Sequence, residues 1–138
     1  MIIIDGNGMI FGRVATLIAK KAIEGEEVHL INAENMILTG DEKSIIAKFK
    51  ARRAAQHKGT PEHSPHFSKV PHLLVKRMLR GMLPKQSARG TAALKKIMVY
   101  SGNPKGLKTN LEVKEAVFGG GIKHMKMSEL CSMLGYSG

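Results

Sequence analysis

The sequence contains no tryptophan and a single cysteine, and only 4% of its 138 residues are aromatic. The one cysteine, Cys131, excludes an internal disulfide framework and a four-cysteine zinc site. No apolar run approaches the roughly 18 residues that a membrane-spanning helix needs. The opening residues, MIIIDGNG, lack the charged and apolar regions of a signal peptide. We therefore expect a soluble intracellular protein that has no contact with a membrane.

Acidic residues are scarce in the middle of the chain. Residues 63–111 hold ten Lys or Arg and no Asp or Glu. The wider segment 41–111 has 16 basic and 3 acidic residues, whereas residues 1–40 have 3 basic and 5 acidic ones; the overall net charge is +11. One-signed charge on this scale attracts anions, and solubility alone does not require such segregation. The middle of the chain therefore indicates a nucleic-acid partner.

The order of the predicted elements favours a parallel α/β sheet covered on both faces, within one domain. Four short apolar runs predict strands over residues 2–4, 28–31, 36–38 and 97–100. The spacing of apolar residues, with capping and stop signals, predicts helices over residues 12–24, 41–57, 71–83, 91–95 and 128–134. Residues 57–70 and 103–126, which contain Gly and Pro, are typical of loops.

Two glycine-rich turns follow predicted strands and suggest nucleotide binding. A dinucleotide-binding loop needs a third glycine three residues after the second, but Phe11 stands there after Gly6-Asn7-Gly8. In the second turn, residues 102–106, three residues rather than four separate the glycines, and Pro104 removes a backbone donor. A small nucleotide-binding α/β enzyme that uses the loop from Gly6 to Gly12 remains the alternative interpretation.

Potential metal ligands and nucleophiles are few. The histidines of the middle segment are His57, His63, His66 and His72. Zinc needs three or four fixed ligands, and only Glu62 accompanies these histidines in the loop. Cys131 lies on an apolar helical pattern and is typical of a small core residue. We expect no metal, no cofactor, no catalytic residue and no small-molecule substrate.

The predicted helix at residues 71–83 has one apolar and one basic face. Its apolar side carries Leu74, Val75, Met78, Leu79 and Met82. Its opposite side presents Lys76, Arg77 and Arg80, with no acidic residue to pair with them. The preceding predicted helix is basic near its end, and we expect its last turn to project from the body together with the loop that follows.

These observations define a candidate RNA-binding surface. Its predicted residues are Lys48, Lys50, Arg52, Arg53, His57, Lys58, Lys69, Lys76, Arg77, Arg80, Lys85, Arg89, Lys95 and Lys96. Because aromatic residues are so few, recognition of phosphates and of RNA shape is favoured over base stacking. A general DNA-binding or chromatin protein is a further alternative with the same charge pattern.

One motif of the sequence resembles a known family. Gly81-Met82-Leu83-Pro84-Lys85, followed by Gly90 and by the strand at residues 94–100, is similar to the signature of large-subunit ribosomal protein thirteen. Asp5-Gly6, Gly12-Arg13 and the segment at residues 32–40 resemble this family too. The resemblance covers about residues 2–104, and the compact start is similar to archaeal members.

The resemblance implies a three-layer α/β/α fold with a four-stranded parallel sheet, in a single domain over residues 1–138. Its core would span about residues 1–104, with a loosely matching tail at 105–138. The implied role is non-enzymatic: a structural constituent of the large ribosomal subunit, located in the ribosome in the cytoplasm, that binds and stabilises folded large-subunit ribosomal RNA. The implied partners are this RNA and neighbouring ribosomal proteins, with large-subunit protein three as a candidate.

Overall fold

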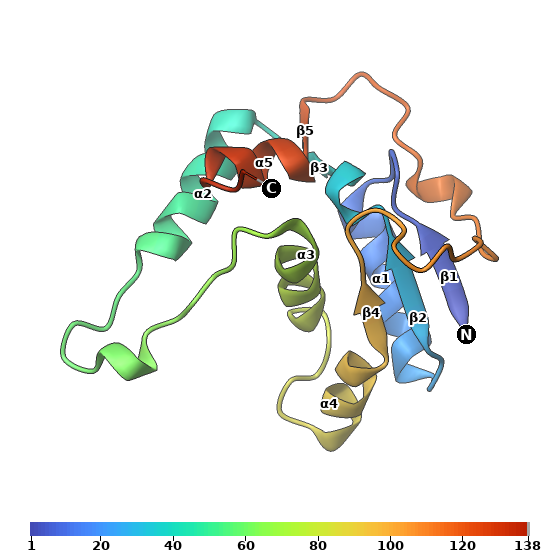
Figure 1. Cartoon of the computed structure of the whole chain (residues 1–138), viewed down its shortest axis with the longest axis horizontal. Helices are drawn as coiled ribbons and strands as arrows, with labels where there is room; N and C mark the ends of the chain where they lie inside the picture. Colours follow the sequence, from blue (N-terminus) through green and yellow to red (C-terminus); the bar gives the residue numbers. More distant parts are fainter. Residues whose placement is uncertain (138) are drawn as a thin grey trace.

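A three-stranded parallel sheet forms the centre of the protein. The computed structural model describes residues 1–137. The strands β1 (Ile2–Asp5), β2 (Val28–Ile31) and β4 (Ile97–Val99) lie in the order β1-β2-β4 (Figure 1). All four residues of β2 are buried, as expected for the central strand of a parallel sheet. The three strands predicted at residues 2–4, 28–31 and 97–100 are thus confirmed.

The three helices α1 (Phe11–Ile23), α3 (Pro71–Arg80) and α4 (Ala88–Lys95) pack into one core with the sheet. Helix α1 is amphipathic, and its end is followed by Gly25, whose φ of 102° suits glycine. The strand order runs in one direction across the sheet. Helix α1 packs against α4, and α3 packs against β4 and η1.

The extended segment 101–113 (orange in Figure 1) follows β4 and reaches the free edge of β1. The Asn110 side chain accepts a hydrogen bond from Ile3 N and donates one to Met1 O, at 2.7 and 3.0 Å. The ammonium of Lys105 lies over the Tyr100 ring at 5.3 Å. The α/β class that the sequence predicted is confirmed, and Asn110 fastens the segment 101–113 to the edge of β1 that does not pair with β2.

The prediction of a fourth strand in the parallel sheet is wrong. Strand β3 (Ile37–Thr39) pairs antiparallel with β5 (His124–Lys126) in a separate two-stranded sheet. A single parallel bridge between Ile10 and Ile37 links β3 to the chain near β1. Strand β5 has three residues and lies within the segment 103–126, where the prediction of a loop is therefore wrong. Its partner is far away in the sequence, so no local pattern could indicate the pairing.

Helix α2 (Glu42–Ala54) extends away from the sheet. The carboxylate of Asp41 caps it by accepting a hydrogen bond from Ser44 N at 3.3 Å. Phe49 is its one buried residue. The helix ends three residues earlier than predicted, and the loop at 55–70, which includes the short helix η2 (Pro61–His63), projects with its last turn (Figure 1).

Helix α3 is shorter at its end than the sequence predicted. It stops at Arg80, so Met82 is 42% exposed and does not join the core, whereas Leu83 in the following turn is 5% exposed. Ser87 then caps α4 by accepting a hydrogen bond from Gly90 N at 3.2 Å, and α4 starts three residues before the predicted position. Residues 81–87 thus form a tight connection rather than a continuation of α3.

The last third of the chain completes the core. Its elements are η3 (Lys114–Ala116), β5 and α5 (Met127–Met133), and the short helix η1 (Ala33–Asn35) lies against α5. Met125, Met127, Leu130 and Cys131 are each at most 1% exposed and belong to the same core as the sheet. None of the helices within residues 1–137 is long and apolar enough to cross a bilayer.

Candidate nucleic-acid interface

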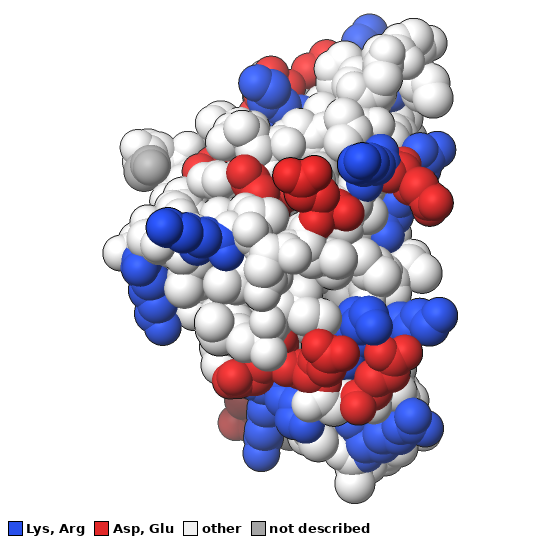
Figure 2. Space-filling model, turned by 90° about the vertical axis from the view of Figure 1, so that its right-hand side faces the viewer, with Lys and Arg blue, Asp and Glu red and all other residues white. Residues whose placement is uncertain are grey.

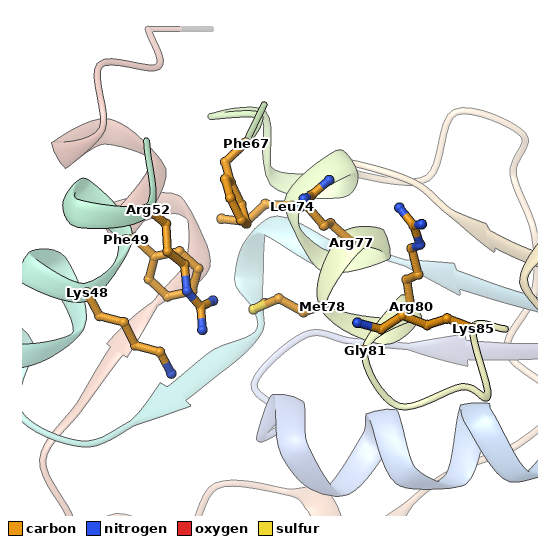
Figure 3. Close-up of a pocket in the computed structure, with 10 residues that line it drawn as sticks. All are labelled: Lys48, Phe49, Arg52, Phe67, Leu74, Arg77, Met78, Arg80, Gly81 and Lys85. Carbon is orange, nitrogen blue, oxygen red and sulfur yellow. The ribbon is translucent and has the colours of Figure 1, made fainter. Parts of the chain in front are cut away.

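Five cationic side chains converge on a groove of about 490 Å³ between α2 and α3 (Figure 3). We call this the cationic groove; its cations are Lys48, Arg52, Arg77, Arg80 and Lys85. Helix α2 supplies the first two, α3 the next two, and the turn after α3 the last. All five were predicted as RNA-binding residues, and the fold brings them together from three segments.

Two aromatic rings support the arginines of the cationic groove. The guanidinium of Arg77 lies 4.1 Å from the centre of the Phe67 ring, and that of Arg52 lies 5.3 Å from the centre of Phe49. Such contacts orient a guanidinium and leave its N–H donors free for an anion. Met78 and Leu74 complete the apolar part of the lining. The groove is therefore a set of oriented cations above an apolar floor.

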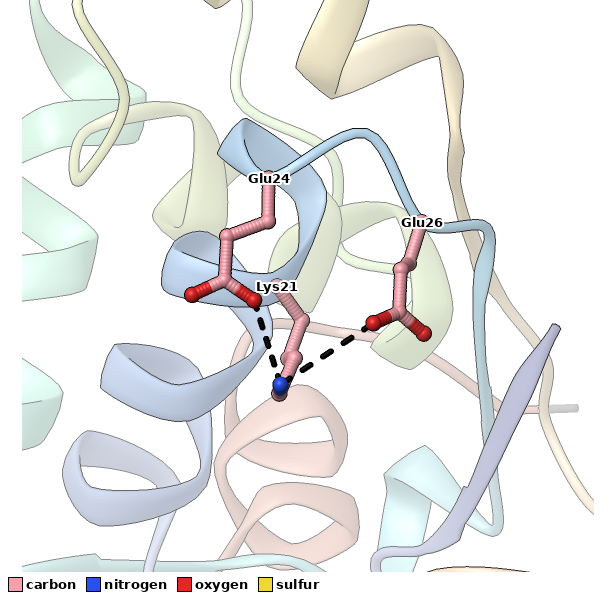
Figure 4. A network of polar contacts seen from close by, with 3 residues as sticks. All are labelled: Lys21, Glu24 and Glu26. Atoms are coloured by element: carbon pink, nitrogen blue, oxygen red, sulfur yellow. Dashed lines mark hydrogen bonds and ion pairs between the residues drawn. The ribbon is translucent and has the colours of Figure 1, made fainter.

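No carboxylate neutralises the cationic groove. None of its lining residues is acidic. Within residues 1–137, the Lys and Arg that form ion pairs lie elsewhere: Lys21 pairs with Glu24 at 3.1 Å and with Glu26 at 3.9 Å (Figure 4), and Lys123 pairs with Asp41 at 3.6 Å. A concave surface with one sign of charge concentrates anions.

Another face of the molecule carries charges of both signs. Figure 2, which views the molecule from the right-hand side of Figure 1, shows Asp and Glu interleaved with Lys and Arg. The ion pairs of Lys21 illustrate this mixed charge, and the hydrogen bond from Lys21 to Glu24 raises the pKa of Lys21 above its ordinary value. This face therefore differs from the cationic groove, whose lining holds no acidic residue.

Three further predicted residues line a second hollow, within the projecting loop. Arg53, His57 and Lys58 contribute to this hollow of about 490 Å³, together with His66. Arg53 also donates a hydrogen bond to Phe67 O, which fastens the loop to α2. We call this cavity the loop hollow. Phe67 links the two cavities, because it lines the cationic groove and its carbonyl accepts the hydrogen bond from Arg53, which lines the loop hollow.

The remaining predicted cations lie outside both cavities. Four of them lie on α2, α3 and α4 with exposed or half-buried side chains: Lys50, Lys76, Arg89 and Lys95. Lys69 and Lys96 donate hydrogen bonds to backbone carbonyls, to Gly135 O at 3.3 Å and to Gly25 O at 3.0 Å. The ammonium groups of these two lysines thus hold the C-terminal turn and the turn after α1.

The motif at residues 81–85 has a steric role. Pro84 O accepts hydrogen bonds from both the backbone N–H and the hydroxyl of Ser87, each at 3.1 Å. Pro84 O also lies so close to Gly90 that a Cβ atom added to Gly90 would be only 2.0 Å from this oxygen. Glycine at position 90 therefore allows α4 to approach this turn. Lys85, which ends the motif, lines the cationic groove.

The glycine turns do not offer a phosphate cradle. All five backbone N–H groups from Gly6 to Ile10 donate hydrogen bonds to acceptors of the protein itself. In the second turn, Gly102 N donates to both oxygens of the Glu34 carboxylate, and Asn103 bonds to Leu107 through both side-chain atoms. These bonds hold the conformation of both turns, and the N–H groups that precede α1 are not free for a phosphate.

Nor do the histidines gather around a metal. Within residues 1–137 no group of three His, Cys, Asp or Glu is placed to hold an ion. His72 Nδ1 lies 3.2 Å from the Ser101 hydroxyl, whereas His57 and His66 line the loop hollow.

We expect the Cys131 thiol to resist alkylation in the folded protein. Its side chain is buried, and burial raises the pKa of the thiol to about 11, so little thiolate exists at pH 8. Iodoacetamide at pH 8 should label the native protein far more slowly than protein unfolded in guanidinium chloride. Mass spectrometry measures both rates, and equal labelling would contradict the burial of α5.

Phe67 is the residue of the site that the sequence analysis missed. It lies in a segment that predicted an irregular loop, and its partner Arg77 is on a different element. No local spacing connects the two. The one available signal was the presence of a Phe among polar loop residues, because such a side chain usually needs an apolar or cationic partner.

A basic α/β domain with an open groove of one charge sign belongs to the class of proteins that bind polyanions. The family model named Ribosomal protein L13 matches residues 1–106, and the chain belongs to this family. It is therefore a ribosomal protein and not an enzyme.

Curated relatives extend the similarity. Large ribosomal subunit protein uL13 of Methanocaldococcus jannaschii is 33% identical over 136 residues and covers 98% of both chains. Its counterpart in Methanosphaera stadtmanae is 35% identical over 136 residues, with 96% of both chains covered. That of Methanococcoides burtonii is 40% identical over 104 residues, covering 75% of this chain and 73% of the relative. These relatives are archaeal, as the resemblance predicted, and the similarity continues into the C-terminal tail.

Proposed function

We propose that the protein is a structural constituent of the large ribosomal subunit and binds folded large-subunit ribosomal RNA through the cationic groove. The observation that carries this proposal is the convergence of five unneutralised cations from α2, α3 and the turn after α3. Membership of the ribosomal protein L13 family supplies the RNA context.

The mechanism is neutralisation of phosphates where RNA segments approach one another. Two segments of folded RNA repel each other through their backbones, and a protein that places fixed cations between them lowers that repulsion. The arginines held over Phe49 and Phe67 are pre-oriented, so less conformational entropy is lost when a phosphate binds. The groove requires no base-specific contact.

The mixed face and the C-terminal tail supply a separate surface for neighbouring ribosomal proteins, with large-subunit protein three as the candidate. Within this proposal residues 1–138 act as one domain. The core membership of Met125, Met127 and Leu130 supports this, because the tail cannot separate from the sheet without exposing them.

The proposal predicts a steep dependence of RNA affinity on salt. If the five groove cations each contact a phosphate, the slope of log K against log salt is about −3.5 to −4.5. Affinity for a fragment of archaeal large-subunit RNA should then fall about 10²- to 10³-fold between 50 and 200 mM KCl. Filter binding across a salt series measures it.

The same series with duplex DNA at equal phosphate concentration provides the comparison. Weaker competition by DNA than by folded ribosomal RNA is expected. A nearly flat salt response would remove the electrostatic mechanism, and equal competition would favour the general DNA-binding alternative.

A further inference from the structure

The loop hollow is built from the residue types that hold a nucleotide. Arg53 and Lys58 supply cations, and His57 and His66 supply flat rings. Imidazole rings are among the side chains on which unstacked RNA bases rest. Pro61 and Pro65 form part of the remaining wall. A cavity of about 490 Å³ has room for a single base with its sugar.

The chain itself holds the walls of the hollow in place. His57 N donates a hydrogen bond to the Ser64 hydroxyl at 2.9 Å, which closes the loop on itself. Thr60 N donates to His57 O, and Ser64 N donates to Pro61 O, both at 3.2 Å. The bond from Arg53 to Phe67 O anchors the far end of the loop to α2. The hollow thus has a defined shape before any ligand binds.

The hollow continues the path of the cationic groove. Arg52 belongs to the groove and Arg53 to the hollow, and Phe67 stands at the boundary, with its ring under Arg77 and its carbonyl bound by Arg53. An RNA backbone that follows the groove cations therefore reaches the hollow. The guanidinium of Arg53 has five N–H donors, so those not used on Phe67 remain for a phosphate.

We propose that the loop hollow receives one unstacked nucleotide of the RNA, with its base against the imidazole rings of His57 and His66 and its phosphate at Arg53 and Lys58. This inference rests on the proposed function. It adds that the RNA carries an unpaired nucleotide beside the helical segment held by the cationic groove. Recognition then combines phosphate neutralisation with a preference for RNA that has a bulge.

Two RNA probes test this inference: a duplex of 20 base pairs, and the same duplex with one unpaired 2-aminopurine nucleotide. The intact protein should bind the bulged duplex more tightly and quench the fluorescence of 2-aminopurine. In the His57→Ala, His66→Ala double variant we expect the preference to fall about 5- to 10-fold and the quenching to disappear, because base–aromatic stacking is lost. Truncation at His57 leaves its backbone bond to Ser64 intact.

His63→Ala is the matched control. His63 belongs to the same loop, its side chain is 73% exposed, and it does not line the hollow. The control should keep both the preference and the quenching. A loss in the control equal to that in the double variant would overturn the inference, because it would reflect loop folding.

The failure of this inference is distinguishable from failure of the proposed function. If the intact protein binds both duplexes equally and tightly, the loop hollow does not select an unpaired base while the cationic groove still binds RNA. If the intact protein binds neither duplex nor ribosomal RNA fragments, the groove mechanism fails and the inference falls with it. Quenching that persists in the double variant would place the base elsewhere.

Discussion

Replacing both Arg77 and Arg80 by glutamate should lower the affinity for large-subunit ribosomal RNA by at least about 100-fold. Each arginine lines the cationic groove, and a charge-assisted hydrogen bond to phosphate contributes about 1.5–3 kcal/mol. The two carboxylates would also repel the phosphates that remain. Filter binding at 100 mM KCl measures the loss, and co-sedimentation tests association with large subunits.

The matched control for this double variant is Lys20→Glu with Lys114→Glu. Both lysines are exposed and lie outside the groove, on α1 and η3, so the net charge changes equally. The control should retain most of the affinity, and circular dichroism should show that both variants are folded. Similar losses in the two variants would mean that net charge, rather than the groove, determines binding.

Gly90→Ala is the substitution with the largest expected effect on stability. The added Cβ would lie 2.0 Å from Pro84 O and 2.6 Å from Pro84 C, which are backbone atoms that cannot move independently. Relief of this clash requires α4 to move away from the turn that buries Leu83. We expect a loss of about 3 kcal/mol in the free energy of unfolding, and a fall of about 10 °C in Tm.

Gly59→Ala serves as the control for Gly90→Ala. No atom lies within 4 Å of a Cβ built on Gly59, so its stability should change by at most about 0.5 kcal/mol. Thermal unfolding monitored by circular dichroism compares the two. If Gly90→Ala unfolds at the temperature of the unmutated protein, the close approach of α4 to Pro84 does not exist in solution.

The sequence was most informative where one segment carries its own signal. The buried runs of β1, β2 and β4 and the apolar stripe of α3 are local patterns, and the structure has these elements close to their predicted positions. The segregation of charge is also local, because α2 and α3 are both in the middle segment. Five of the fourteen predicted cations therefore meet in one groove.

Long-range contacts account for what the sequence could not predict. The pairing of β3 with β5 joins residues 37–39 to residues 124–126, and the apolar run at 36–38 predicted a strand but not its partner. The attachment of Asn110 and Leu111 to the edge of β1 likewise joins distant residues, within a segment that predicted only a loop. The contact of Phe67 with Arg77 is equally non-local. In each case tertiary packing decides between alternatives that are locally equivalent.

The position of α5 has a consequence for the timing of synthesis. This helix packs against α2, α3 and η1, with Leu130 and Cys131 fully buried. While its residues are still inside the exit tunnel of a translating ribosome, α2 and α3 lack the support that sets the distance between them. A nascent chain therefore cannot present the finished groove until α5 has emerged and packed against α2 and α3.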